Sequence, residues 1–281
     1  MGYYTRELEA PWPYLQRYFD FAADSGNLTS NILHNFNERG ERVYKVNVGL
    51  SNLITSSEDA FSRMFYDMEV MAKPIYCDMV VAILSFEDGD RVRSLRHLER
   101  VTVNLREMLG IFYEKLSERH ISHKAWLSYV QGFQAWGVGR VIDGEYVKSD
   151  GLSGNHVLVF QALDAFLGMK PFLSDDVSSK YIPGNQRRLS TSLRDSGFRD
   201  KVNAAGDESL KAEMSKIANH LRVFRAAHRA RVMSYLEEPA PERFPMTAGM
   251  SVLAYESDSK TLKQSIAPLD ELLASRLRDT V

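Results

Sequence analysis

Two long stretches of helical periodicity constrain the fold of this chain more than any other feature of its sequence. Residues 59–86 place apolar side chains three or four positions apart, which is the spacing of the buried face of a helix. Residues 93–118 repeat that spacing, with charged residues between the apolar ones. Both stretches therefore predict long amphipathic helices, and Pro74 is expected to kink or divide the first of them.

Other parts of the chain also favour helix, either through apolar spacing or through glycines and prolines that would end one. A turn through Asp143 and Gly144 predicts a small hairpin, and segment 41–50 alternates like a strand without a visible partner. The sequence thus predicts an all-α fold, with a single large helical domain over residues 1–281. The further expected helices are 123–137, 155–167, 185–194 and 209–236.

The composition excludes several classes of protein. A net charge of −2, with acidic and basic residues interspersed, gives no basic field of the kind that nucleic-acid binding requires. The single cysteine, Cys77, allows no intrachain disulfide, thiolate zinc site or iron–sulfur cluster, and we expect it to be a buried core thiol. No apolar stretch is long enough to span a bilayer. These features predict a cytoplasmic protein without nucleic-acid or membrane partners, and the long amphipathic helices are compatible with a homo-oligomer.

Five segments follow one another in an order that resembles a family of haem enzymes. Residues 160–168 read Phe-Gln-Ala-Leu-Asp-Ala-Phe-Leu-Gly, and residues 181–187 read Tyr-Ile-Pro-Gly-Asn-Gln-Arg. Residues 124–128 read Lys-Ala-Trp-Leu-Ser, residues 247–249 read Thr-Ala-Gly, and residues 223–233 carry a central histidine. Together they are similar to the indoleamine 2,3-dioxygenases. The wider superfamily includes tryptophan dioxygenases, a rearranging enzyme of the pyrrolnitrin pathway and histidine-ligated haem enzymes that hydroxylate tyrosine.

The resemblance covers roughly residues 55–255 and leaves residues 1–54 as a shortened N-terminal region. It implies a fold like the large domain of an indoleamine 2,3-dioxygenase, with haem b held between helices and O₂ as co-substrate. The haem would be noncovalent, because the chain has no Cys-x-x-Cys-His motif.

The resemblance makes His228 the proximal ligand of the iron. A neutral imidazole binds haem iron well and leaves the opposite face open. Arg225 stands three residues earlier on the same helical face, and the family pattern pairs it with Asp164. That pair would clamp two helices and place positive charge near a haem propionate; without haem it is an ordinary interhelical ion pair. The other candidate ligands are His34, His97, His120, His123, His156 and His220.

On the distal side the sequence departs from the family pattern at one position. Aligning residues 124–127 with the family's Lys-Ala-Phe-Phe puts Gln131 where those enzymes have the arginine that binds the substrate carboxylate. Glutamine carries no charge, so either the substrate lacks a carboxylate or Arg63, Arg140 or Arg187 binds it.

The other residues that the resemblance assigns to the site form two groups. One is an apolar wall that would stack on an aromatic substrate, and the same side chains also suit plain core packing. The other consists of hydroxyl and glycine positions that match loops on either side of the haem, where they can hydrogen-bond substrate or O₂. The first group is Phe61, Phe65, Trp126 and Leu127, and the second is Ser153, Gly154, Thr247 and Gly249.

Two histidines bear on the type of reaction. Dioxygenation of an indole needs no strong base, whereas hydroxylation of a phenol benefits from a distal acid or base. His156 follows Gly154 by two residues at a predicted helix start, where it either points into the site as a catalytic group or caps the helix. His34 is a weaker candidate for the same catalytic role.

We therefore expect a haem-dependent oxygenase that inserts oxygen from O₂ into a small aromatic substrate. The first choice is 2,3-dioxygenation of an indole or tryptophan derivative. The first alternative is a histidine-ligated haem monooxygenase or rearranging enzyme of secondary metabolism that acts on a tyrosine- or tryptophan-derived substrate. Two further alternatives are a non-catalytic haem carrier or gas sensor, and a helical interaction module without haem.

Overall fold

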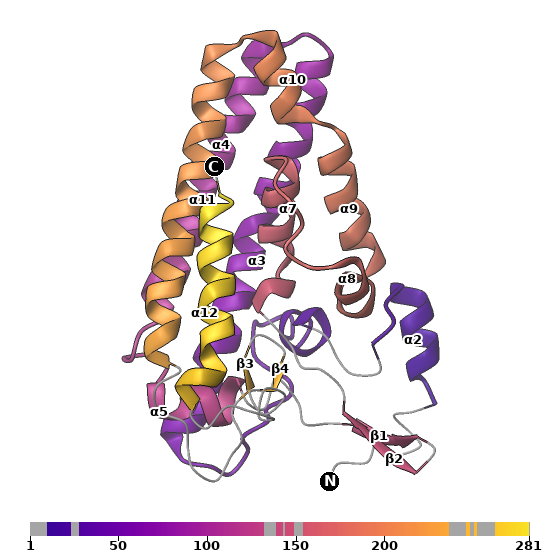
Figure 1. The fold of residues 1–281 in the computed structure, drawn as a ribbon, viewed down its shortest axis with the longest axis vertical. Helices are drawn as coiled ribbons and strands as arrows, with labels where there is room; N and C mark the ends of the chain where they lie inside the picture. Colours follow the sequence, from indigo (N-terminus) through magenta and orange to yellow (C-terminus); the bar gives the residue numbers. More distant parts are fainter. Residues whose placement is uncertain are drawn as a thin grey trace.

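The computed structural model describes residues 10–23, 28–131, 139–142, 144–148, 154–235, 246–247, 250–251 and 262–280. Within these ranges the chain is predominantly helical, which confirms the prediction of a helical fold. Figure 1 shows the long helices standing side by side, with two short hairpins near one end of the molecule. One contiguous hydrophobic core joins the long helices.

Helices α3 (Asn52–Glu87) and α4 (Arg91–Lys115) form an antiparallel pair that is the framework of the fold (Figure 1). The chain reverses at Gly89, whose φ of +83° lies in the left-handed region that favours glycine. Asp90 then caps α4, since its carboxylate accepts a hydrogen bond from the backbone N–H of Arg93 at 2.9 Å. The predicted apolar stripes of both helices are buried, among them Phe61, Met68, Ile75, Leu98, Leu105 and Phe112.

Pro74 lies inside α3 and does not divide it, so that part of the prediction is wrong. Pro74 is exposed, whereas Ala72 and Ile75 on either side of it are fully buried. A proline in a helix interior costs about 3 kcal/mol, largely through the lost hydrogen bond. Burial of the long apolar face of α3 against α4 outweighs that cost and keeps the helix continuous.

Helix α11 (Glu208–Tyr235) lies along α4 and is the third long helix. Its bounds agree with the predicted helix to within a residue at each end. Helices α7 (Leu158–Phe166) and α9 (Gly184–Asp195) pack against each other, and α7 also contacts α3. The α3–α4 pair, α7 and α11 are far apart in the sequence and surround the same hydrophobic core (Figure 1).

Short elements complete the described part of the chain. The predicted hairpin is present as β1 (Gly139–Ile142) and β2 (Glu145–Lys148), with Val141 opposite Tyr146. A second hairpin is formed by β3 (Met246–Thr247) and β4 (Met250–Ser251). The other elements are α2 (Trp12–Phe19), η1 (Thr29–Leu33), α5 (His123–Ala125), η2 (Trp126–Gln131), η3 (Gly154–His156), α8 (Asp175–Tyr181), α10 (Phe198–Ala205) and α12 (Leu262–Arg278).

The predicted strand over residues 41–50 is wrong. In this region the described chain has only an isolated bridge between Phe36 and Arg42. The buried carboxylate of Glu58 on α3 instead accepts hydrogen bonds from the backbone N–H groups of Val46 and Asn47, at 2.9 and 2.8 Å. The backbone N–H groups of Val46 and Asn47 are therefore satisfied by a side chain and need no neighbouring strand.

Two side chains on the α3–α4 pair lie in surroundings that differ from expectation. Cys77 is exposed, so the prediction of a buried thiol is wrong. It stands on the side of α3 away from Met79, which occupies the core position. His97, one of the other candidate ligands, is already engaged, because its Nδ1 lies 2.8 Å from Oδ1 of the buried carboxylate of Asp78 and hydrogen-bonds it.

Helix α12, which the sequence analysis missed, docks through a buried ion cluster. The carboxylate of Asp164 on α7 accepts hydrogen bonds from Arg225 of α11, at 2.5 Å, and from Arg276 of α12. Arg225 also donates to the hydroxyl of Thr280 at 2.5 Å, and Arg276 to the carbonyl of Lys170 at 2.9 Å. The three charged side chains are all buried, and together they tie α7, α11 and α12 to one another.

No helix in the part of the chain that the structure describes has the length and apolar character needed to cross a membrane.

Removing the central charge of this cluster should strongly destabilise the fold. Asp164→Asn leaves two buried guanidinium groups without a counter-charge, and breaking a buried ion pair in this way costs about 3–5 kcal/mol. We expect that loss in the free energy of unfolding, measured by urea denaturation at pH 7. Asp270→Asn on α12 is the control, because its partner Arg229 forms a much more exposed pair, and the loss should be far smaller. Equal losses in the two variants would contradict this account.

Candidate functional site

The inner face of α11 carries His228 among aromatic rings from three helices. Its imidazole lies nearly parallel to the ring of Phe224, with centroids 5.7 Å apart and an interplanar angle of 18°. Phe112 of α4 approaches the same imidazole at 5.6 Å, and Phe160 of α7 stacks on Phe224 at 4.6 Å. Phe224 precedes His228 by four residues, so one helical turn places both rings on the same face.

The surroundings of His228 keep its ring neutral. Burial, together with the nearby positive charge of Arg225, lowers its pKa to about 4. Part of the ring surface is still accessible, and none of the described residues hydrogen-bonds to either ring nitrogen. A neutral imidazole nitrogen with a free lone pair is the form that binds haem iron.

The predicted pair between Arg225 and Asp164 is present, and it belongs to a larger cluster than expected. Arg276 is a third member, so two guanidinium groups surround one carboxylate and leave one net positive charge. Burial lowers the pKa of Arg225, and the charge of Asp164 opposes that shift. Arg225 stands three residues before His228, which places this positive charge within one turn of the imidazole.

A second aromatic cluster joins four candidate or neighbouring residues. Phe61 contacts Phe65 at 5.0 Å and Trp126 at 6.0 Å between ring centroids, and Trp126 contacts Tyr235 at 5.6 Å. A methyl group added at Gly154 would meet the ring of Phe65 at 3.3 Å, so this glycine lies directly over that ring. The structure therefore brings together the predicted residues Phe61, Phe65, Trp126 and Gly154.

Tyr235 connects this cluster to the helix of His228. The two residues are seven positions apart on α11, about two turns and roughly 10 Å along the same face. The hydroxyl of Tyr235 and the indole N–H of Trp126 are both buried without a hydrogen-bond partner. Burial raises the pKa of Tyr235 to about 12, so its hydroxyl stays protonated and can donate. Two unused donors thus lie at the aromatic cluster, and each would gain from an acceptor on a ligand.

His156 makes a different contact from the one a distal catalytic group would need. Its ring stacks on Tyr181 at 5.2 Å with an interplanar angle of 10°, and its Nδ1 is buried without a hydrogen-bond partner. Burial lowers its pKa to about 4. Among the described ring contacts it does not touch the cluster of Phe61, Phe65 and Trp126. His34 is exposed at the end of η1.

The arginines considered as carboxylate binders have other partners where their side chains are described. The guanidinium of Arg63 lies 4.7 Å from the ring of Phe36 and hydrogen-bonds the carbonyl of Gly40. Arg187 pairs with Asp20 at 2.8 Å. The side chain of Arg140, in β1, lies outside the described residues.

The remaining predicted site residues are described only in part. Leu127 and Gln131 belong to η2, and Thr247 to β3, but their side chains lie outside the described part of the structure. Strand β3 packs against η2, so the backbone of Thr247 lies beside the helix that carries Trp126. Ser153 and Gly249 lie outside the described residues.

No protein-family model matches the chain, and no curated protein matches it at a significant level. The haem site therefore stays a prediction that rests on the motifs of the chain and on the geometry around His228.

Sequence reasoning missed Tyr235, Phe224 and Arg276. Tyr235 stands seven residues after His228, and Phe224 stands four residues before it. Both spacings place the side chains on the same helical face as His228, so the sequence could have identified them. Arg276 gave no local signal, since its partner Asp164 is 112 residues away.

His156 and His228 should make the protein less stable in weak acid. Their folded pKa of about 4 lies below the unfolded value of about 6.5, so the unfolded state binds more protons. Stability should therefore fall as the pH drops from about 6.5 to about 4, by about 2 kcal/mol per histidine between pH 7 and pH 5. Urea denaturation of haem-free protein at both pH values measures this loss.

The variants His228→Gln and His156→Gln should each remove about one half of that loss, and the double variant should remove both halves. An unchanged pH dependence in the double variant would show that these two imidazoles do not carry the effect.

Proposed function

We propose that the protein is a haem-dependent oxygenase that acts on a planar aromatic substrate, with an indole derivative as the first choice. The observation that carries this proposal is the state of His228. Its imidazole is neutral, packed by aromatic rings and without a hydrogen-bond partner among the described residues. A neutral imidazole that no described side chain engages is available to bind an iron.

The residues around His228 fit a haem better than a metal ion held by protein side chains alone. No group of three or more histidine, cysteine, aspartate or glutamate side chains that could bind a metal lies among the described residues. A single imidazole is sufficient for haem, because the porphyrin supplies the other nitrogen ligands. His228 would bind the iron, and the net positive charge of Arg225, Arg276 and Asp164 would favour an anionic propionate nearby.

Haem held by a histidine supplies an iron that activates O₂ for attack on an electron-rich ring. The chain itself supplies the surroundings of the substrate. Phe61, Phe65 and Trp126 offer apolar ring faces and edges against which an aromatic substrate can pack. The same side chains exclude water, and the unused donors of Trp126 and Tyr235 can bind an acceptor atom of the substrate.

Dioxygenation is favoured over phenol hydroxylation by the placement of His156. Opening an indole 2,3-bond requires no strong base, whereas hydroxylation of a phenol benefits from one. The described contacts of His156 are with Tyr181, and none is with the aromatic cluster. The neutral Gln131 on η2 favours a substrate whose binding does not depend on a charged carboxylate contact, and this departure from the dioxygenase pattern supports the monooxygenase or rearranging alternative.

Haem binding should depend on His228 and on no other histidine of α11. Ferric and ferrous absorption spectra of the haem-supplemented protein should show a Soret band that is lost in His228→Ala. His220→Ala is the matched control, because His220 stands on the same helix about two turns earlier, and its spectrum should be unchanged. In His228→Gly, added imidazole should restore the band, which separates loss of the ligand from loss of the fold.

Other outcomes of this experiment would favour the alternative functions. If neither protein takes up haem, or if the variant takes it up equally, the ligand assignment is wrong and the helical interaction module without haem is supported. A His228-dependent Soret band that no indole, tryptophan or tyrosine perturbs would favour a haem carrier or gas sensor over an oxygenase.

Substrate binding should depend on the aromatic cluster, separately from haem uptake. Trp126→Leu removes one aromatic contact and one donor, and an aromatic pair contributes about 0.5–1.5 kcal/mol beyond its buried area. We expect the Kd for indole, from titration of the Soret shift, to rise by about tenfold while the Soret intensity is kept. Trp12→Leu, on the distant α2, should leave that Kd unchanged. Equal effects of the two variants would contradict a role of Trp126 in substrate binding.

A further inference from the structure

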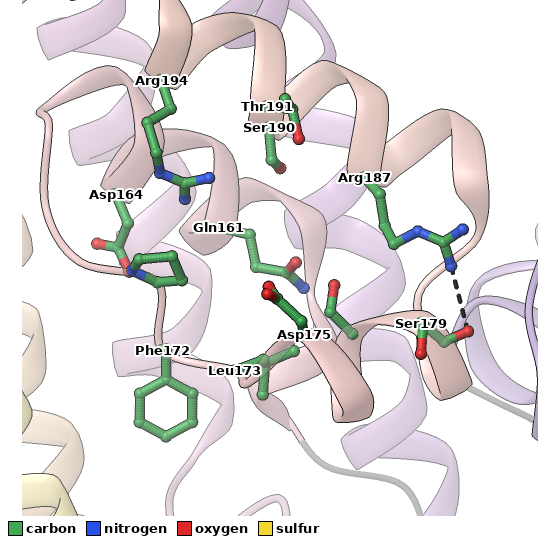
Figure 2. A pocket seen from close by; sticks show the side chains of 12 residues that line it. Gln161, Asp164, Phe172, Leu173, Asp175, Ser179, Arg187, Ser190, Thr191 and Arg194 are labelled. Carbon is green, nitrogen blue, oxygen red and sulfur yellow. Dashed lines mark hydrogen bonds between the residues drawn. The ribbon is translucent and has the colours of Figure 1, made fainter.

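A pocket of about 290 Å³ lies between α7, α8 and α9, and Asp164, the partner of Arg225, is one of the residues that line it. Figure 2 shows it from close by. Ser190 of α9 points into it from above, and the side chains of Gln161 of α7 and Asp175 of α8 lie below. The volume suits a small metabolite, since ligand pockets begin at about 300 Å³.

Helix α9 contributes two groups that are free to bind an anion. Arg187, Ser190 and Arg194 are spaced three and four residues apart, so they share the face of α9 that lines the pocket. The hydroxyl of Ser190 is buried without a hydrogen-bond partner, and so is Nε of Arg194. No described carboxylate forms an ion pair with Arg194, whereas Arg187 is already paired with Asp20. Arg194 and Ser190 are therefore the groups left for a ligand carboxylate.

The opposite side of the pocket offers one negative charge. Asp175 lines the pocket from the first turn of α8, and no described lysine or arginine forms an ion pair with it. Its neighbour Asp176 is instead paired with Lys180. The other acidic lining residue, Asp164, is neutralised by Arg225 and Arg276. The pocket thus combines one unpaired cation with one unpaired anion.

Part of the remaining wall is apolar. Phe172 and Leu173, together with Pro171, line the pocket between α7 and α8. An unpaired cation, an unpaired anion and an apolar wall match the three parts of one class of molecule. We propose that this pocket binds a free α-amino acid with an apolar side chain. Arg194 and Ser190 hold its carboxylate, Asp175 faces its ammonium group, and Phe172 and Leu173 contact its side chain.

The charges of the pocket disfavour other small ligands. A phosphate or dicarboxylate would bring a second negative charge close to Asp175, and only one cation of the lining is without a partner. A simple amine would leave Arg194 and Ser190 unsatisfied. The site needs neither haem nor His228, so this proposal is independent of the proposed oxygenase function.

Isothermal titration calorimetry with the full chain tests the site. The probes are L-valine, L-leucine and L-methionine, which are not aromatic and so do not compete for the proposed oxygenase site. We expect at least one of them to bind, most tightly L-leucine, and Arg194→Gln to raise its Kd by about tenfold or more. Asp175→Asn should also weaken L-leucine, but it should leave 4-methylpentanoate, which lacks the amino group, unchanged or bound more tightly.

Matched controls separate the site from general effects of charge. Arg188→Gln and Asp176→Asn change neighbouring residues of the same two helices that do not line the pocket, and both should bind L-leucine like the unmodified chain. The His228→Ala variant should bind L-leucine as tightly as the unmodified chain does. Loss of haem binding in that variant would therefore not be mistaken for loss of the amino-acid site. Circular dichroism of each variant verifies that the fold is kept.

Two results would overturn the proposal. One is that none of the three amino acids binds the unmodified chain at concentrations up to about 10 mM. That concentration is roughly the weakest Kd expected for a specific site with so small a ligand. The other is that Arg194→Gln weakens L-leucine and 4-methylpentanoate equally while Asp175→Asn has no effect. That pattern would describe a general carboxylate site and not an amino-acid site.

Discussion

The carboxylate of Asp164, held between Arg225 and Arg276, is the interaction on which most of the structure depends. It joins α7, α11 and α12, whose contributing residues are as much as 112 positions apart in the sequence. None of the three charges would be stable in the core alone, because each needs the others to offset its desolvation. The cluster also sets the rotation of α11 about its axis. With Arg225 turned toward Asp164, His228 one turn later must face the rings of Phe112 and Phe224.

The surroundings of His228 follow from that rotation. Aromatic rings pack well against an imidazole but offer it no strong hydrogen bond, so the ring is desolvated and stays neutral. Two turns further along α11, Tyr235 contacts Trp126 of η2, and each of the two keeps a buried donor without a partner. An acceptor atom of a bound ligand would satisfy both donors, which is why the aromatic cluster suits a substrate with such an atom.

The sequence predicted the parts of this arrangement that depend on local pattern. Apolar spacing identified α3, α4, α9 and α11, and a family resemblance named the pair of Arg225 and Asp164 before its contact was seen. Interactions between distant residues left no such signal. Segment 41–50 alternates like a strand, yet its backbone donors bind Glu58, which no periodicity can show. Nothing in the local sequence distinguishes Arg276 from other basic residues, and its role is seen only because α12 packs against Asp164 in the fold.

The same ion cluster adjoins both proposed ligand sites, since Asp164 lines the pocket and Arg225 stands one turn before His228. Its two guanidinium groups exceed its single carboxylate by one positive charge, which raises the electrostatic potential toward α11 on one side and toward the pocket on the other. The ligands proposed for the two sides each bring carboxylate groups to that potential. A carboxylate bound on one side neutralises part of the charge that attracts the other. Occupancy of one site should therefore weaken the other slightly, and by thermodynamic reciprocity the effect must be equal in both directions.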